Sequence, residues 1–125
     1  MLNKTYECSQ LEFYIKFFQI LNIIQSSEEL KLQKQEILIL SHLLLLVDND
    51  YKTKRFKLPG QIQVRNILQI SNANVKTTLS KLVKKKYLYL DDNGDKQLSP
   101  KLKQILDNAI ETKDFSIVFK FKIHE

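Results

Sequence analysis

Basic side chains are concentrated in one third of this 125-residue chain. Residues 51–90 contain ten lysines and arginines and no aspartate or glutamate, whereas the rest carries the other 10 basic and all 14 acidic residues, a balance of 10 − 14 = −4. Clustered cations attract phosphates, so this block indicates a polyanionic partner. The alternative is an ordinary solvated face of lysines.

Residues that could contact a nucleic acid recur in this block with the period of a helix. If Val75, Leu79, Leu82 and Val83 face a core, the opposite face carries short polar side chains and lysines. Asparagine can pair with adenine, small side chains can contact the thymine methyl, and lysine can contact phosphate. The candidate DNA-binding residues are Asn72, Ala73, Asn74, Lys76, Thr77, Ser80, Lys81 and Lys84 on this helix, with Arg65, Lys54 and Arg55 as flanking backbone contacts. A plain solvated helix face remains the alternative.

The elements that must position these residues can be predicted from capping signals and hydrophobic periodicity. Two Ser-x-x-Glu capping boxes, at Ser9 and Ser26, are expected to open the first two helices. The predicted elements are helices over 9–25 and 26–47, a basic loop over 51–60, helices over 61–68 and 72–86, strands over 87–90 and 96–98 around an Asn-Gly turn, a helix over 100–110 and a strand over 114–123. The expected fold is therefore a single domain over 1–125, mainly α with a small β component (α+β).

Two segments outside the central block are more apolar than a small module needs. The helix over 9–25 is apolar on most sides, and the segment over 114–123 alternates strictly between apolar and other residues. An isologous homodimer through one of these segments would match the two-fold symmetry of a DNA operator. We therefore expect a homodimer.

The central block resembles a known family of regulators. The resemblance rests on residues 64–79, on Leu82 and Lys85-Lys86-Tyr87-Leu88, and on Leu98-Ser99-Pro100. These residues are similar to the winged helix-turn-helix regulators of the multiple-antibiotic-resistance (MarR) type over about residues 60–107. The resemblance implies a winged helix-turn-helix over 61–110 with a recognition helix at about 72–86. The helical pair over 9–47, which could serve dimerisation, and the C-terminal strand over 114–123 are expected as additions to it.

This chain departs from the family pattern at several positions. Gln69 stands where the turn usually has glycine, and Arg65 replaces a small residue of the preceding helix. The wing tip is acidic, with Asp91, Asp92 and Asp95, so we expect the wing to be structural and not to bind phosphate. The predicted strand over 114–123 takes the place of the family's long dimerisation helix.

The expected function is sequence-specific binding of double-stranded DNA by a small transcriptional regulator, leaning towards A·T-rich sequence because the recognition helix has no arginine. A replication or partition initiator, or a winged helix used as a protein-interaction module, remains an alternative. No catalytic constellation, phosphate loop or metal-ligand cluster is evident, so we expect no enzyme activity, cofactor, metal or small-molecule ligand. The longest apolar run, over 37–47, is too short for a membrane span, and a cytoplasmic location is expected.

Overall fold

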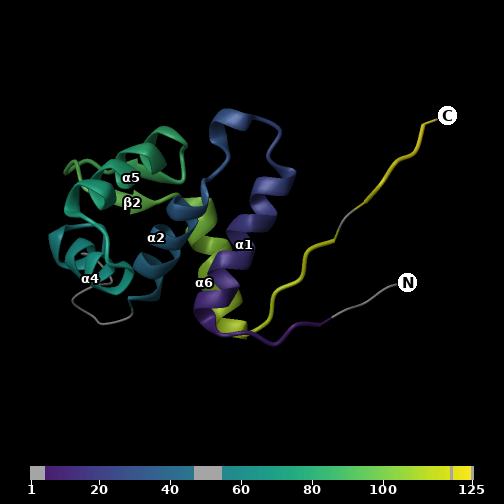
Figure 1. The fold of residues 1–125 in the computed structure, drawn as a ribbon. Helices are drawn as coiled ribbons and strands as arrows, with labels where there is room; N and C mark the ends of the chain where they lie inside the picture. The colour runs from purple at the N-terminus through teal and green to yellow at the C-terminus, as the bar shows by residue number, and fades with distance from the viewer. Residues whose placement is uncertain (1–4, 47–54, 119, 125) are drawn as a thin grey trace.

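The computed structural model describes residues 5–46, 55–118 and 120–124 (Figure 1). These residues are mainly helical, with a small two-stranded antiparallel sheet. The elements, in chain order, are α1 (Gln10–Ile24), a 3-10 turn η1 (Glu28–Leu30), α2 (Lys34–Leu45), α4 (Leu58–Leu68), α5 (Asn72–Lys84), β1 (Leu88–Leu90), β2 (Lys96–Leu98) and α6 (Pro100–Thr112).

Helix α2 is the centre of the core. It packs against α1 on one side and against α4 and α5 on the other, as Figure 1 shows. Its sequence explains this position, because a helix that is apolar on most sides must be covered on most sides. Its buried residues are Glu36, Ile37, Ile39, Leu40, Ser41, Leu43 and Leu44. Phe18 of α1 and Val64 of α4 complete the core next to this helix.

The two predicted capping boxes had different outcomes. The box at Ser9 is confirmed: the Ser9 hydroxyl accepts a hydrogen bond from the amide of Glu12, and the Glu12 carboxylate accepts one from the amide of Ser9. The expected helix over 26–47 is wrong at its start, because α2 begins at Lys34 with a box formed by Gln33 and Glu36. The loop before α2 is held by Asn22, whose side-chain amide donates to the carbonyl of Leu32 and accepts from its amide.

Helix α4 begins three residues before the predicted position, at Leu58 instead of residue 61. Pro59 and Gly60, interpreted from the sequence as the end of a loop, lie in its first turn. Proline fits the first turn of a helix because the amide that it lacks would have no partner there. Of the expected basic loop, residues 51–54 lie outside the described part of the chain.

The predicted strand over 114–123 is wrong for the residues that the structure describes. Residues 114–118 and 120–124 belong to no strand. The alternation predicted a half-buried strand, but the described residues of this segment are exposed, and the described chain offers no strand for it to pair with. Figure 1 shows this C-terminal segment running away from the body of the molecule.

Tyr87, just before β1, connects α5 to the hairpin and to α6 through its hydrogen bonds. Strands β1 and β2 pair with Leu88 opposite Leu98 and Leu90 opposite Lys96. The Tyr87 amide donates to the carbonyl of Leu82 in α5, and its own carbonyl accepts from the amide of Ser99 just before α6. Its ring packs edge-on against Phe18 of α1. Tyr87 thus joins α5, the hairpin, α6 and α1.

Candidate nucleic-acid interface

Helix α5 is amphipathic, and its buried side fixes how it is turned. Ser71 caps its first turn, because the Ser71 hydroxyl accepts from the amide of Asn74 at 3.1 Å. Val75, Leu79 and Leu82 are buried, as the sequence predicted. Val83, at the edge of this buried side, is half-buried. Thr78 is also buried, although the hydrophobic pattern of the sequence did not indicate it.

Every candidate residue on α5 is exposed: Asn72, Ala73, Asn74, Lys76, Thr77, Ser80, Lys81 and Lys84. At 100° per residue, Ala73, Thr77 and Ser80 fall along the middle of this face, with Lys84 in line with them at its C-terminal end, and Lys76 and Lys81 fall on its two flanks. Small residues in the middle allow a close approach, and flanking lysines can reach charges on either side. Of the sequence-predicted residues, the structure therefore brings these eight onto one face.

Arg65 lies beside the start of α5. Its guanidinium donates to the side-chain oxygen of Asn72 at 3.2 Å and to that of Asn66 at 3.4 Å. The Arg65 side chain therefore lies next to the N-terminal end of α5. This is the end at which base contacts are expected, so Arg65 is placed where it could contact the neighbouring backbone of a nucleic acid. The same hydrogen bond engages the amide oxygen of Asn72, so Asn72 is a positioning residue for Arg65 as well as a candidate contact.

Arg55, predicted to flank the interface, is turned towards the body of the molecule. Arg55 is partly buried, and its guanidinium donates to the carbonyl of Leu44 in the last turn of α2 at 3.2 Å. Burial lowers the pKa of this guanidinium, and electrostatic interactions with Tyr14 and Asp107 oppose the effect. Arg55 is a cap for the end of α2, where carbonyls lack helical partners. Lys54, its predicted companion, lies outside the described residues.

The turn between β1 and β2, predicted from the sequence as an acidic wing tip, is organised by its own acidic residues. One carboxylate oxygen of Asp91 accepts from the amides of Asn93 and Asp95, each at 2.9 Å, and the other accepts from the side chain of Gln97. Hydrogen bonding, first of all from the amide of Asp95, lowers the pKa of Asp91. Asp95 in turn pairs with Lys57 at 3.3 Å. These contacts give Asp91 a structural role and partly neutralise one lysine of the basic block.

The turn between α4 and α5 depends on a left-handed residue. Gln69, at the position where the resembling family has glycine, adopts φ 57° and ψ 45°. This conformation lets the amide of Ile70 donate to the carbonyl of Arg65 and close the end of α4. A side chain in this region costs about 1–2 kcal/mol relative to glycine, and the greater freedom of unfolded glycine offsets part of that.

We expect Gln69→Gly to stabilise the protein by about 0.5–1 kcal/mol, because it removes the left-handed penalty without changing any charge. Urea unfolding followed by circular dichroism measures the change. Gln69→Ala is the matched control and should give no gain, since alanine keeps the Cβ atom. Equal stabilisation by both substitutions would contradict a backbone origin.

The described residues contain no group of three or more His, Cys, Asp or Glu side chains able to hold a metal ion. Cys8 is exposed. No helix in the described part of the chain is long and apolar enough to cross a membrane. Comparisons with models of known protein families, with curated proteins and with solved structures find no match.

Proposed function

We propose that this chain is a winged helix-turn-helix protein that binds double-stranded DNA sequence-specifically as a small transcriptional regulator. In this proposal α4 and α5 are the helix-turn-helix, β1 and β2 form the wing, and α5 enters the major groove. The observation that carries the proposal is the exposed face of α5, which has small side chains along the middle of its N-terminal part, lysines on its flanks and at its C-terminal end, and no carboxylate.

The dimensions and chemistry of this face suit a major groove. The groove of B-DNA is about 12 Å wide and admits one helix, whose N-terminal residues meet base edges. Asn74 and Thr77 would then contact bases, with Ala73 against a thymine methyl. Lys81 and Lys84 would contact phosphates. Without an arginine on α5, the bidentate contact to guanine is lost, so the proposed preference is for A·T-rich sequence.

The proposal is tested by selecting binding sites from a pool of randomised duplexes and then titrating selected and scrambled duplexes by fluorescence anisotropy at several salt concentrations. We expect Lys81→Ala with Lys84→Ala to weaken binding roughly tenfold or more. The same change should reduce the slope of log affinity against log salt by about 2, because two phosphate contacts disappear.

The charge-matched control is Lys16→Ala with Lys103→Ala, which removes two lysines from α1 and α6, on the other side of α2 (Figure 1). This variant should keep most of the affinity and of the salt slope. Equal losses in the two double variants would mean that net charge alone attracts DNA. Salt-independent binding, or no enrichment of any sequence, would reject the proposed function.

A further inference from the structure

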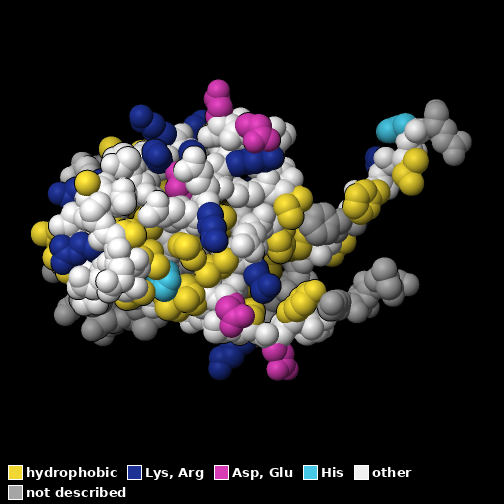
Figure 2. All heavy atoms as spheres, viewed as in Figure 1, with side chains coloured by type: hydrophobic (Ala, Val, Ile, Leu, Met, Phe, Trp, Pro, Cys, Tyr) yellow, Lys and Arg dark blue, Asp and Glu magenta, His cyan; other side chains and the backbone are white. Residues whose placement is uncertain are grey.

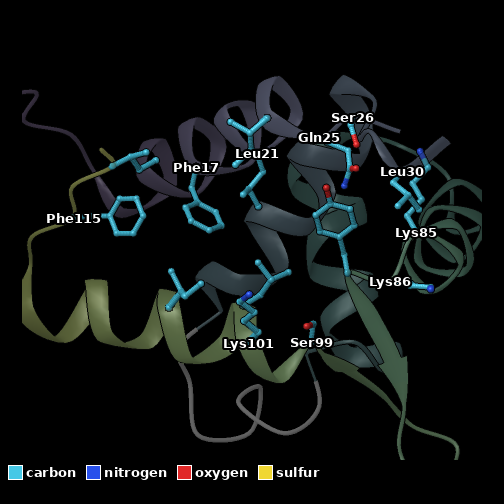
Figure 3. Close-up of a pocket in the computed structure, with 15 residues that line it drawn as sticks. Phe17, Leu21, Gln25, Ser26, Leu30, Lys85, Lys86, Ser99, Lys101 and Phe115 are labelled. Atoms are coloured by element: carbon cyan, nitrogen blue, oxygen red, sulfur yellow. The ribbon is translucent and has the colours of Figure 1, made fainter. Parts of the chain in front are cut away.

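An open apolar groove of about 730 Å³ lies between α1 and α6 (Figure 3). Phe17 and Leu21 line it from α1, and Leu102 and Ile105 line it from α6. The lining also includes polar and charged side chains, namely Gln25, Ser26, Lys85, Lys86, Ser99 and Lys101. Along the apolar walls water makes few hydrogen bonds, so an apolar segment that displaced it there would gain free energy.

The C-terminal segment already supplies part of this groove. Phe115 and Ile117 line one end of it, and the Phe115 ring packs edge-on against Phe13 and Phe17 at centroid distances of 5.4 and 5.5 Å. In Figure 3, Phe115 and Phe17 lie next to each other in the space between the two helices. An extended chain with an apolar side chain at every second position therefore matches the groove in chemistry.

The same sequence pattern continues beyond Ile117. The described residues of this continuation, 118 and 120–124, are called here the distal tail. Its side chains Phe121 and Ile123 are 85% and 87% exposed. They follow Phe115 and Ile117 in the alternation, whereas Lys120 and Lys122 occupy the intervening positions. Figure 2 shows the hydrophobic side chains of the distal tail standing apart from the body.

We propose that two copies of this chain exchange distal tails, each tail lying in the α1–α6 groove of the other copy. Phe121 and Ile123 continue the apolar side of the chain that Phe115 and Ile117 begin, and Leu21, Leu102 and Ile105 offer apolar walls to them in the open part of the groove. With Phe121 and Ile123 facing the groove, Lys120 and Lys122 face water. Reciprocal exchange closes the assembly as a two-fold dimer, in which both tails and both grooves are used.

The buried area is sufficient for a stable dimer. Two large apolar side chains and the groove surface that they cover bury on the order of 600 Å² per tail, so two tails bury about 1,200 Å², the lower end of the range for specific interfaces. A tail that folded back into the groove of its own chain would bury the same side chains within a monomer. Oligomeric state therefore separates the two arrangements.

The experiment is sedimentation equilibrium of the full chain and of Phe121→Ser with Ile123→Ser, across a concentration series. Both side chains are exposed in the single chain, so this variant should keep its circular dichroism spectrum and its melting temperature at low concentration. We expect the unchanged chain to dimerise and the variant to dissociate at least 100-fold more readily. The matched control, Lys120→Ser with Lys122→Ser, should remain dimeric because it alters the solvent side of the tail.

The groove side is tested by Ile24→Asp, which places a carboxylate on an exposed part of the groove wall. It should weaken the dimer as strongly as the tail variant does. A monomeric full chain, or a dimer that survives either substitution, overturns the exchange. The inference is independent of the proposed function, because a monomer that still binds DNA would overturn only the exchange, and a dimer without DNA affinity would overturn only the proposed function.

Discussion

Replacing Lys85 by methionine is expected to destabilise the protein by about 3–5 kcal/mol, because it leaves a buried carboxylate without its counterion. The ammonium of Lys85 lies 2.6 Å from a carboxylate oxygen of Glu36, and the two side chains are 16% and 3% exposed. Lys85 also donates to the carbonyl of Lys31 at 2.9 Å. The amide of Gln33 also donates to the first oxygen of Glu36, but the second oxygen is buried and has no hydrogen-bond partner in the described structure, so the carboxylate would keep only one neutral donor after the loss.

The ion pair on the surface of α6 provides the control. Lys103 and Asp107 are 2.8 Å apart but are 67% and 66% exposed, so Lys103→Met should cost at most about 1 kcal/mol. Urea unfolding at neutral pH measures both variants. Replacing Glu36 and Lys85 together by methionine should cost less than the sum of the single changes, since no charge then remains buried. A cost for Lys85→Met as small as that for Lys103→Met would contradict a buried pair.

The second large effect is expected at Gly60, where alanine should destabilise the protein by about 2–3 kcal/mol. A Cβ atom added to Gly60 would lie 1.9 Å from the carbonyl oxygen of Arg55 and 2.6 Å from its carbonyl carbon. Both atoms belong to the backbone, so the chain before α4 would have to move away. That movement would pull Arg55 from the end of α2, where it caps the carbonyl of Leu44.

The sign of this effect is informative, because alanine inside a helix is normally better than glycine by about 1 kcal/mol. Thermal unfolding of Gly60→Ala distinguishes the two expectations, and a neutral or stabilised variant would show that the chain does not approach Gly60 so closely. Gly94→Ala is the comparison for a purely conformational cost. Gly94 has φ 77° and nothing within 4 Å of an added Cβ, so we expect a loss of about 1–2 kcal/mol there.

Features of the candidate interface that depend on local sequence could be predicted. The stripe of Val75, Leu79 and Leu82 and the cap at Ser71 lie within one helix, and these residues determine which face of α5 is exposed. The hairpin around Gly94 is local for the same reason. The left-handed turn at Gln69 could be located, because it interrupts two helical patterns at a single residue.

Features that depend on distant residues could not be predicted. Lys85 looked like one more cation of the basic block, and only its partner Glu36, 49 residues earlier, shows that it faces inwards. Arg55 is likewise turned inwards by a carbonyl of α2, 11 residues before it. The predicted start of α2 was wrong because two residues, Ser26 and Gln33, each precede a glutamate by three positions. The structure uses the Gln33 box, whose glutamate, Glu36, also pairs with the distant Lys85. The basic block therefore overstates the charge available to a partner.

The position of Tyr87 has a consequence for communication across the molecule. It lines the groove between α1 and α6, and it is also hydrogen-bonded through its amide to the last turns of α5. A segment bound in the groove would thus contact Tyr87, whose backbone is hydrogen-bonded to the C-terminal part of α5, the proposed recognition helix. If groove filling and DNA favour the same arrangement of this junction, thermodynamic linkage makes each raise the affinity of the other by one common factor. Assembly and DNA binding would then be two readouts of a single conformational equilibrium.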